Sequence, residues 1–526
     1  MQEAKDKMID EKKRERIITA LLITGILGFL TLIGITNLFH FCYAMDADIA
    51  SDAILGKLIW DSKEIIPGTW YVAAETRIIC MANVASLFYG LTHNLSLAAG
   101  LACCTMTVLI IISVFYFGRV GLLLRWKETL LSAFLCLMLP AGLSFLELSY
   151  LFASYYAVHI VILFFTFGVY LEIHRKNRIN WIKLSACLVP ALLLGVQGAR
   201  GLLVIYGPLF GMAVIFGLYE VYCGKKLRKM DVIVCLWTVA MLAVSFWGMS
   251  FPFSVGQEFS RNIRNGFQKL WAEVLPDMLC AMGFGSSQCL LAKAGAAFLM
   301  LITAGLVIDL LYRMCRKREI DTVERGFLLL CSSPVVTAFI VAFTTVEDSE
   351  RYYFLFSFVM VYGAVLFFRR MRADTAFRRG LRLSLCLVIL ALTTERFCNI
   401  YLPVLKAEEP PQGEISEVVC FLEEHDFQTA YSTFENANLM TVLSNGKTRV
   451  ASVGSVEKMN ICKWMSSTDW YVPNVPYEER TAYVIPESQM EAFQAFLAVH
   501  GEDMKLEAQI GRFLIYSSDY NFSCLE

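Results

Sequence analysis

Two aspartates, Asp46 and Asp48, combine a residue type and a position that could do chemistry, because they follow the first long apolar segment of the chain. A carboxylate at the edge of a membrane is costly to keep charged where it is partly dehydrated, so such acids are functional candidates. One of them could act as a general base and take the proton of an attacking hydroxyl group. The alternative is that both are solvated loop charges, or that one caps a helix predicted over Ala50 to Trp60. We favour a structural role for the later acids of this loop, which are Asp52, Asp61 and Glu64.

A second set of charged and polar residues lies in connections between apolar segments, on the side of the membrane that carries Asp46. The guanidinium group of arginine can hold a phosphate through a planar fork of donors, and a glutamate among apolar residues needs a cation, a metal or a substrate hydroxyl. We therefore predict that a substrate or its phosphate contacts Glu147, Arg200, Arg261, Arg264, Glu347, Asp348, Arg351 and Tyr352.

Several of these predictions have a structural alternative. Arg200 could instead reach lipid headgroups with its charged end. Arg351 could form an ion pair with Glu347 in the same loop. Arg261 and Arg264 lie on a segment with helical apolar spacing, so they could contact ordinary lipid phosphates of the outer leaflet.

The elements that position these residues are membrane spans. Hydrophobic residues make up 57% of the chain and charged residues only 18%, and the mean hydropathy of +0.56 exceeds that of ordinary soluble domains. The net charge of -1 argues against nucleic acid as a partner. A span needs about 20 apolar residues. Eleven segments qualify: Ile17 to Leu38, Leu95 to Phe117, Thr129 to Leu148, Tyr155 to Ile173, Trp181 to Gly198, Gly201 to Tyr222, Val232 to Met249, Leu291 to Tyr312, Gly326 to Thr344, Tyr353 to Phe368 and Leu383 to Tyr401.

Six clusters of Lys and Arg fall at almost every second connection, and these residues accumulate on the cytoplasmic side of membranes. The alternation predicts a multi-pass plasma-membrane protein with a cytoplasmic N-terminus, a retained first span and an extracytoplasmic C-terminal segment. We interpret Ile78 to Leu91 as lying in the outer interface, because counting it as a crossing would invert every later loop. A short true span is the alternative for this segment.

The predicted fold is an all-α membrane bundle of about eleven spans, followed by a small extracytoplasmic α/β domain. Residues 1–16 are a cytoplasmic basic tail, residues 17–402 the membrane domain with its acidic outer loop 39–94, and residues 403–526 the outer domain. Residue periodicity predicts the elements of the outer domain. Helices are expected at Glu414 to Glu424 and Ser488 to Val499, and strands at Thr429 to Phe434, Arg449 to Val453, Thr481 to Ile485 and Arg512 to Ser517.

Most of the 17 cysteines lie inside apolar segments, where Cys behaves as a small hydrophobic residue. A disulfide between Cys280 and Cys289, both in one outer connection, is an open alternative. Walker loops, GxSxG elbows, HExxH motifs and dinucleotide fingerprints are all absent from the sequence, which argues against a pump driven directly by a nucleotide.

The acidic motif after the first span, the Trp70-Tyr71 patch of the long outer loop and the interfacial segment resemble features of the C-fold (GT-C) glycosyltransferases of bacterial type. These enzymes use polyprenyl-phosphate sugars, and the resemblance covers roughly Ile17 to Tyr401. It implies an integral membrane glycosyltransferase that moves a sugar from a polyprenyl-phosphate donor to an extracytoplasmic acceptor, which is a cell-surface glycan, a lipid or a protein. The transfer would be of a hexosyl or pentosyl group with inversion, and membrane lipids are further partners.

The resemblance also implies that Asp46 or Asp48 is the catalytic base or binds a metal and the acceptor. No cofactor is certain; Mg²⁺ or Mn²⁺ are the candidates, with Asp46, Asp48 and Glu147 as ligands. The chain departs from the usual adjacent acid pair, because Ala47 separates the two aspartates and leaves open which one is the base. The sequence blocks of oligosaccharyltransferases and the His-Pro-Pro element of protein O-mannosyltransferases are missing, so we assign no subfamily.

Two other classes stay open: a membrane transporter or flippase of lipid-linked sugars, and a non-catalytic scaffold of the cell envelope. A transporter would favour charges at the membrane midplane and an internal repeat. In this sequence the charges cluster at the outer ends of the spans and we find no convincing repeat, which favours the enzyme.

Overall fold

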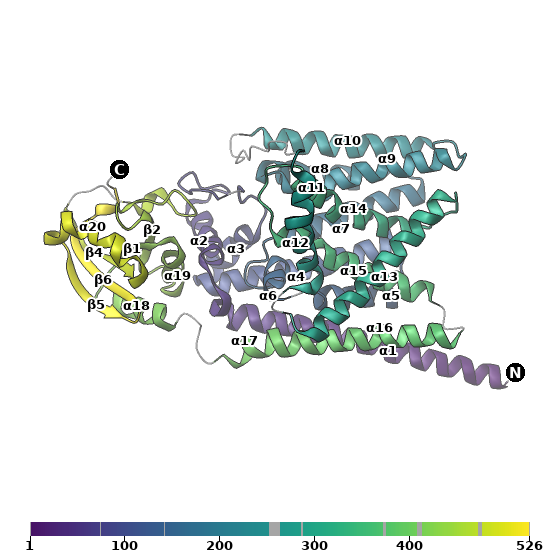
Figure 1. Ribbon diagram of the computed structural model, residues 1–526, viewed down its shortest axis with the longest axis horizontal. Coiled ribbons are helices and arrows are strands. Elements are labelled where there is room, and N and C mark those ends of the chain that lie inside the picture. The colour runs from purple at the N-terminus through teal and green to yellow at the C-terminus, as the bar shows by residue number, and fades with distance from the viewer. Residues whose placement is uncertain are drawn as a thin grey trace. The chain divides into compact units, whose positions relative to one another are not determined.

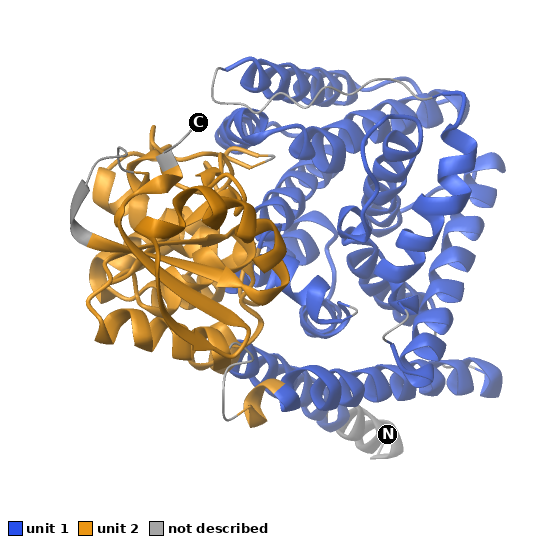
Figure 2. Ribbon diagram, turned by 60° about the vertical axis from the view of Figure 1, so that its left-hand side comes forward, with its two compact units in different colours: residues 1–33, 106–150, 155–403 blue, residues 34–105, 151–154, 404–526 orange. Residues whose placement is uncertain are grey.

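The computed structural model describes residues 2–73, 75–140, 142–251, 263–285, 288–371, 375–407, 413–471 and 476–524. The chain divides into two compact units, which Figure 2 shows in different colours. Unit 1 comprises residues 1–33, 106–150 and 155–403, and unit 2 comprises residues 34–105, 151–154 and 404–526. The acidic loop 39–94 therefore belongs to the same unit as the C-terminal segment. The predicted domain boundary at residue 403 stays a prediction.

Unit 1 is helical, and Figure 1 shows the axes of its long helices α9, α10 and α16 roughly aligned with one another. In chain order the helices are α1 (Gln2–Phe39), α4 (Leu95–Tyr116), α5 (Trp126–Met138), α6 (Leu143–Ser149), α7 (Ala157–Lys176), α8 (Trp181–Gln197), α9 (Gly207–Tyr222), α10 (Lys229–Met249), α11 (Gly266–Lys269), α12 (Leu275–Leu279), α13 (Leu290–Cys315), α14 (Thr322–Ala342), α15 (Leu355–Arg370), α16 (Ala376–Arg396) and α17 (Leu402–Lys406). Three of these, α1, α4 and α17, pass from one unit to the other.

Nine helices in the described part of the chain are long and apolar enough to cross a membrane, and they coincide with nine of the eleven predicted spans. Of the other two, the segment at Trp181 is α8, which is apolar but shorter. The prediction of one span from Thr129 to Leu148 is wrong, because α5 ends at Met138 and α6 begins at Leu143. Pro140 has no backbone N–H to donate, and Gly142 has a φ of 94°, so the helix cannot continue through this segment.

Several residues of the basic clusters form ion pairs with acids of neighbouring helices in unit 1. Buried or half-buried charges need such partners, since removing a charge from water without one is costly. The ion pairs that connect different helices or their flanking turns include Glu15–Lys127, Glu324–Arg313, Glu324–Arg370, Asp309–Arg370 and Glu128–Arg369. This pairing agrees with the predicted alternation of the clusters, and their cytoplasmic location stays a prediction.

Unit 2 contains one sheet with the strand order β3-β2-β1-β4-β6-β5. Its strands are β1 (Thr429–Thr433), β2 (Arg449–Ser455), β3 (Asn460–Ile461), β4 (Pro476–Pro486), β5 (Lys505–Ile510) and β6 (Phe513–Tyr520), and its C-terminal helices are α18 (Gly413–Glu424), α19 (Phe434–Leu443) and α20 (Met490–His500). β1 pairs in parallel with β2 and β4, and the other neighbours are antiparallel. Parallel neighbours need a crossover, which α19 provides between β1 and β2. The predicted helices and strands of this segment are confirmed, whereas the sequence pattern did not predict α19, β3 or β5.

The acidic outer loop forms two helices of unit 2, α2 (Ala47–Ser62) and α3 (Met81–Thr92). α2 packs against α3 and against α19. The segment between α2 and α3 is attached in the same way: the Tyr71 amide donates to the Ser466 carbonyl at 2.8 Å, and the rings of Trp70 and Trp470 meet edge to face at 6.4 Å. The helix that carries the candidate acids is thus supported by the C-terminal part of the chain.

Candidate functional site

Asp46 and Asp48 lie at the N-terminus of α2, where they have different structural roles. Asp46 is the N-cap of the helix, and its Oδ1 accepts a hydrogen bond from the Ile49 amide at 2.8 Å. Asp48 lies in the first turn and is half-buried. The positive end of the helix dipole favours negative charge at both positions. The predicted helix cap is therefore present at Asp46, and the side chain of Asp48 does not take part in it.

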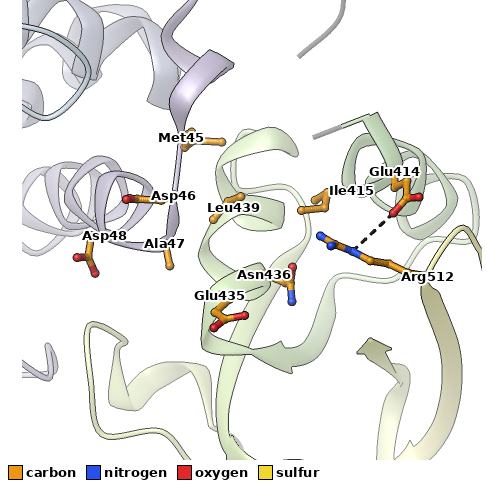
Figure 3. Close-up of a pocket in the computed structure, with 10 residues that line it drawn as sticks. All are labelled: Met45, Asp46, Ala47, Asp48, Glu414, Ile415, Glu435, Asn436, Leu439 and Arg512. Carbon is orange, nitrogen blue, oxygen red and sulfur yellow. Dashed lines mark ion pairs between the residues drawn. The ribbon is translucent and has the colours of Figure 1, made fainter. Parts of the chain in front are cut away.

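Both aspartates line a pocket of about 560 Å³ within unit 2. This volume is in the usual range of small-molecule sites. Figure 3 shows Asp46 and Asp48 on the α2 side of the pocket and Glu435 and Asn436 on the α19 side. The remaining lining residues are Met45, Ala47, Glu414, Ile415, Leu439 and Arg512, and Arg512 Nε is 3.6 Å from Glu414 Oε2. The pocket can therefore offer carboxylates, an amide and a guanidinium to a polar molecule.

Asp52, on the same helix, does not line this pocket, and its contact with Arg77 could not be read from the sequence. Its side chain is buried and lies 3.3 Å from the Arg77 guanidinium. Burial raises the pKa of the Asp52 carboxyl to about 6; Arg77 opposes this rise, and the charges of Asp48 and Asp46 add to it. The available signal was the spacing of four residues between Asp48 and Asp52, which puts both on one face of α2. The electrostatic state of Asp52 is thus linked to that of the two candidate acids.

Arg200 and Tyr352 are brought together in unit 1 from distant parts of the sequence. The Arg200 Cζ lies 4.0 Å from the ring centre of Tyr156 and 5.6 Å from that of Tyr352. Aromatic faces attract a guanidinium and restrict its orientation. The arrangement leaves the planar fork of Arg200 held beside two phenol groups, which suits an anionic group such as a phosphate.

The charged residues of the loop before α15 differ in their surroundings: some are exposed, and one is hydrogen-bonded within the loop. Glu347 and Arg351 are exposed, and the part of the chain that the structure describes contains no ion pair between them, so that alternative interpretation is wrong. Asp348 is engaged, because its Oδ1 accepts hydrogen bonds from the Ser349 amide at 2.9 Å and from the Tyr353 hydroxyl at 2.7 Å. Arg351 therefore remains available to a ligand, whereas Asp348 orders the loop.

The acids facing this loop interact electrostatically. Burial, followed by the negative charges of Asp348, Glu350 and Glu273, raises the pKa of Asp277. The thiol of Cys280 donates a hydrogen bond to Glu350 at 2.6 Å. Cys280 and Cys289 are both free, so the disulfide that the sequence left open is not formed.

The remaining predicted contacts come from other elements of unit 1. Glu147 is half-buried in α6, and Arg264 is exposed just before α11. Arg261 lies outside the described residues. Within the described ranges, no three His, Cys, Asp or Glu residues are grouped so as to hold a metal ion.

A buried ion pair near the end of α16 also escaped the sequence analysis. Arg396 and Glu395 are both buried and hydrogen-bonded to each other, and Arg396 Nη1 also donates to Gln288 Oε1 at 3.1 Å. Two adjacent charges inside the predicted span Leu383 to Tyr401 were the signal that could have revealed it, since such charges need partners in an apolar segment.

Solved structures share the fold of this chain at low sequence identity. The structure of ArnT from Cupriavidus metallidurans in the apo state has a TM-score of 0.54 and 11% identity, and the match covers 95% of this chain and 98% of that chain. The same protein bound to undecaprenyl phosphate has a TM-score of 0.52 and 12% identity, with the same coverage. The archaeal oligosaccharyltransferase AglB from Archaeoglobus fulgidus, in complex with an inhibitory peptide and a dolichol-phosphate, has a TM-score of 0.53 and 11% identity, covering 97% of this chain and 74% of that chain. No protein-family model and no curated protein sequence matches the chain. The GT-C fold expected from the resemblance is confirmed.

Proposed function

We propose that this chain, which has the fold of ArnT and AglB, is an integral membrane glycosyltransferase that moves a sugar from a polyprenyl-phosphate donor to an extracytoplasmic acceptor. The observation that carries the proposal is the position of Asp46 and Asp48, which line a polar pocket on a helix supported by the C-terminal segment. Fold alone does not determine function, so the argument depends on this site. The two matched structures with bound lipid phosphates, ArnT with undecaprenyl phosphate and AglB with dolichol-phosphate, support the class of donor.

We assign the role of general base to Asp48. Asp46 already accepts the capping hydrogen bond of α2, whereas Asp48 is half-buried and takes no part in that cap. In the proposed reaction the acceptor hydroxyl attacks the anomeric carbon of the sugar, and Asp48 takes the hydroxyl proton as the new bond forms. The bond from the anomeric carbon to the phosphate oxygen breaks with its electron pair on the phosphate. One such displacement inverts the anomeric configuration, and base catalysis contributes about 10² to 10⁴ in rate.

The leaving phosphate gains negative charge, so fixed cations should supply a comparable or larger share of the acceleration. Arg200 suits this role, because the rings of Tyr156 and Tyr352 hold its guanidinium in one orientation. Exposed Arg351 and Arg264 are the further cations that we assign to the lipid phosphate. Arg261, outside the described residues, keeps the same assignment.

Metal dependence is a separate part of the proposal. Mg²⁺ and Mn²⁺ prefer oxygen ligands, and Mg²⁺ is commonly bound by one or two carboxylates together with water and substrate phosphates. Asp46 and Asp48 fit that pattern in unit 2, and Glu147 is a candidate ligand in unit 1. Such an ion would neutralise charge on the phosphate, and the step assigned to Asp48 does not depend on it.

The remaining assignments follow the predicted topology. We place the protein in the plasma membrane, with the N-terminus in the cytoplasm and both the acidic loop and the C-terminal segment outside. The transferred group is a hexose or a pentose, and the acceptor is a cell-surface glycan, a lipid or a protein. The donor lipid and the surrounding membrane lipids are the other partners.

The test compares envelope glycolipids and wall polymers from a deletion strain complemented with wild-type chain, with Asp48→Asn, or with the double variant Asp46→Asn and Asp48→Asn. We expect loss of one glycan product at normal expression, while Glu457→Gln, which changes an exposed acid of unit 2 that lines neither this pocket nor a second one in the unit, keeps it. A glycan profile unchanged in the double variant would contradict the enzyme and support a scaffold. Loss of lipid-linked sugar translocation with transfer intact would support a transporter.

A further inference from the structure

Unit 2 has a second pocket, of about 470 Å³, between α2, the start of β1 and β2, and the short helix at residues 468–470. Nothing in the proposed reaction uses it. Its volume falls within the range of small-molecule sites. The lining residues that carry its chemistry are Lys57, Asp61, Lys447, Arg449, Asp469 and Trp470.

The two pockets are lined by the same pair of helices, α2 and α19. Asp48 lines the first pocket and Lys57 the second, and they are nine residues apart on α2, which corresponds to about 14 Å at 1.5 Å per residue. On α19, Glu435 lines the first pocket and Thr441 the second. Both pockets therefore lie at the α2–α19 pair, at different positions along α2.

The charges of the second pocket leave one cation without a carboxylate. Lys57 is paired with Asp61, and Lys447 lies 3.5 Å from Glu423. Arg449 is half-buried and, in the described ranges, has no carboxylate within ion-pair distance. A positive charge that is partly removed from water and lacks a counter-ion favours an anionic ligand.

The hydrogen bonds of Arg449 point to the same conclusion. A guanidinium group has five N–H donors. Arg449 Nη2 makes one long contact, 3.4 Å to Thr429 Oγ1, and its Nε has no partner among the described residues. Nε is enclosed by the protein, so the Nη groups are the donors that remain for an anion in the pocket.

The neighbouring groups suit a sugar better than a bare ion. Asp469 is exposed at the rim and can accept hydrogen bonds from hydroxyl groups. Trp470 contributes an apolar wall whose position is fixed by its contact with Trp70. Guanidinium, carboxylate and indole together match a ligand that has a negative charge, hydroxyl groups and an apolar ring face.

We propose that the second pocket binds an acidic sugar unit, carrying a carboxylate or a phosphate, of the acceptor glycan at a distance from the reacting hydroxyl. The proposal rests on the function proposed above and narrows the acceptor to an acidic glycan. Arg449 is its anchor, because the charge of Lys57 is already paired with Asp61.

The test measures binding of glucuronate, glucose 6-phosphate, glucose and inorganic phosphate to the purified full-length protein in lipid nanodiscs, by ligand-observed NMR titration. We expect glucuronate or glucose 6-phosphate to bind more tightly than both glucose and inorganic phosphate. Arg449→Gln should weaken that binding at least about tenfold, because it removes charge-assisted hydrogen bonds. Arg449→Lys keeps the charge but loses the planar fork of donors, so its affinity should lie between those of wild type and Arg449→Gln. Tighter binding of glucuronate would identify the acidic group of the ligand as a carboxylate, and tighter binding of glucose 6-phosphate would identify it as a phosphate.

Lys458→Gln is the matched control, because Lys458 is exposed in the same unit and does not line either pocket. Equal binding of glucose and both acidic sugars, binding of inorganic phosphate at least as tight as that of both acidic sugars, or unchanged binding in both Arg449 variants would each overturn the proposal. Asp48→Asn separates it from the proposed function: the variant should keep acidic-sugar binding and lose transfer. If it retains transfer, the proposed base is wrong while the binding site stands.

Discussion

At the residue scale, Asp46 and Asp48 can be separated by substitutions that keep or remove the helix cap. Asn caps helices as well as Asp does, so Asp46→Asn should keep the stability of α2 and change only the charge. Asp46→Ala should lower the free energy of unfolding by about 0.5 to 2 kcal/mol. Thermal unfolding of the two purified variants measures this difference, and equal melting temperatures would argue that the Asp46 cap contributes little.

Asp52 makes the stability of the folded chain depend on pH. Its pKa is raised from an ordinary value of 3.8 to about 6 in the folded chain, mainly by burial. The folded state therefore binds the proton of Asp52 more tightly than the unfolded state does. Protonation of Asp52 stabilises the folded state fully below about pH 4, and this contribution to the free energy of unfolding is lost as the pH rises through 6. The loss is on the order of 2 to 3 kcal/mol for a shift of this size.

The corresponding measurement is the melting temperature of wild type and Asp52→Asn between pH 4.5 and 7.5. The variant cannot titrate at this position, so its stability should fall less over this range than that of wild type. The difference between slopes is the test, because loss of the charge that faces Arg77 shifts the absolute stability at every pH. Parallel curves would show that Asp52 does not titrate near 6.

Sequence alone located Asp46 and Asp48, because a charge next to an apolar segment is visible in the sequence. It did not reveal the pairing of Asp52 with Arg77 or the stacking of Arg200 on Tyr156, since these depend on chain segments that only folding brings together. The roles of the candidate residues therefore stay predictions, even where their surroundings are now defined.

At the element scale, the length of an apolar segment predicted most membrane-length helices but did not predict where a helix is interrupted. Nine predicted spans correspond to membrane-length helices, whereas Thr129 to Leu148 is interrupted at Pro140 and Gly142, residues that a count of apolar positions tolerates. α19 was missed for a different reason. It packs against both β2 and α2 and buries most of its residues, including Asn436 and Asn438, so it lacks the one-sided apolar pattern of a surface helix.

The attachment of the acidic loop to the C-terminal segment depends on single polar side chains. Asn445 accepts from the Leu95 amide at 2.8 Å and donates to the His93 carbonyl at 3.0 Å, so it closes the connection between α3 and α4. Asn445→Ala should remove both hydrogen bonds and destabilise the connection by about 1 to 3 kcal/mol. Hydrogen exchange of residues 93–98 should accelerate, while exchange within α20 stays unchanged as an internal control. Equal protection of residues 93–98 from hydrogen exchange in wild type and Asn445→Ala would contradict this role of Asn445.

At the scale of the whole molecule, the chain is not a membrane bundle with a dispensable outer segment. Residues 34–105 and 404–526 form one compact unit, and α2 packs directly on α19. Removing the chain after Pro403 therefore removes the support of the helix that carries Asp46 and Asp48. Such a deletion cannot report on acceptor choice alone.

We therefore expect a chain truncated after Pro403 to insert in the membrane but to lose transfer for every acceptor, because α2 would no longer be held in its folded position. Limited proteolysis of membranes should cut the loop 39–94 of the truncated chain at protease concentrations that leave wild type intact, since unfolded segments are cleaved in proportion to their open population. Arg449→Gln in the full-length chain is the matched comparison: it should keep the loop protected and weaken only the use of acidic acceptors. A truncated chain with a protected loop and full transfer would show that α2 folds without α19, and the C-terminal segment would then have no supporting role.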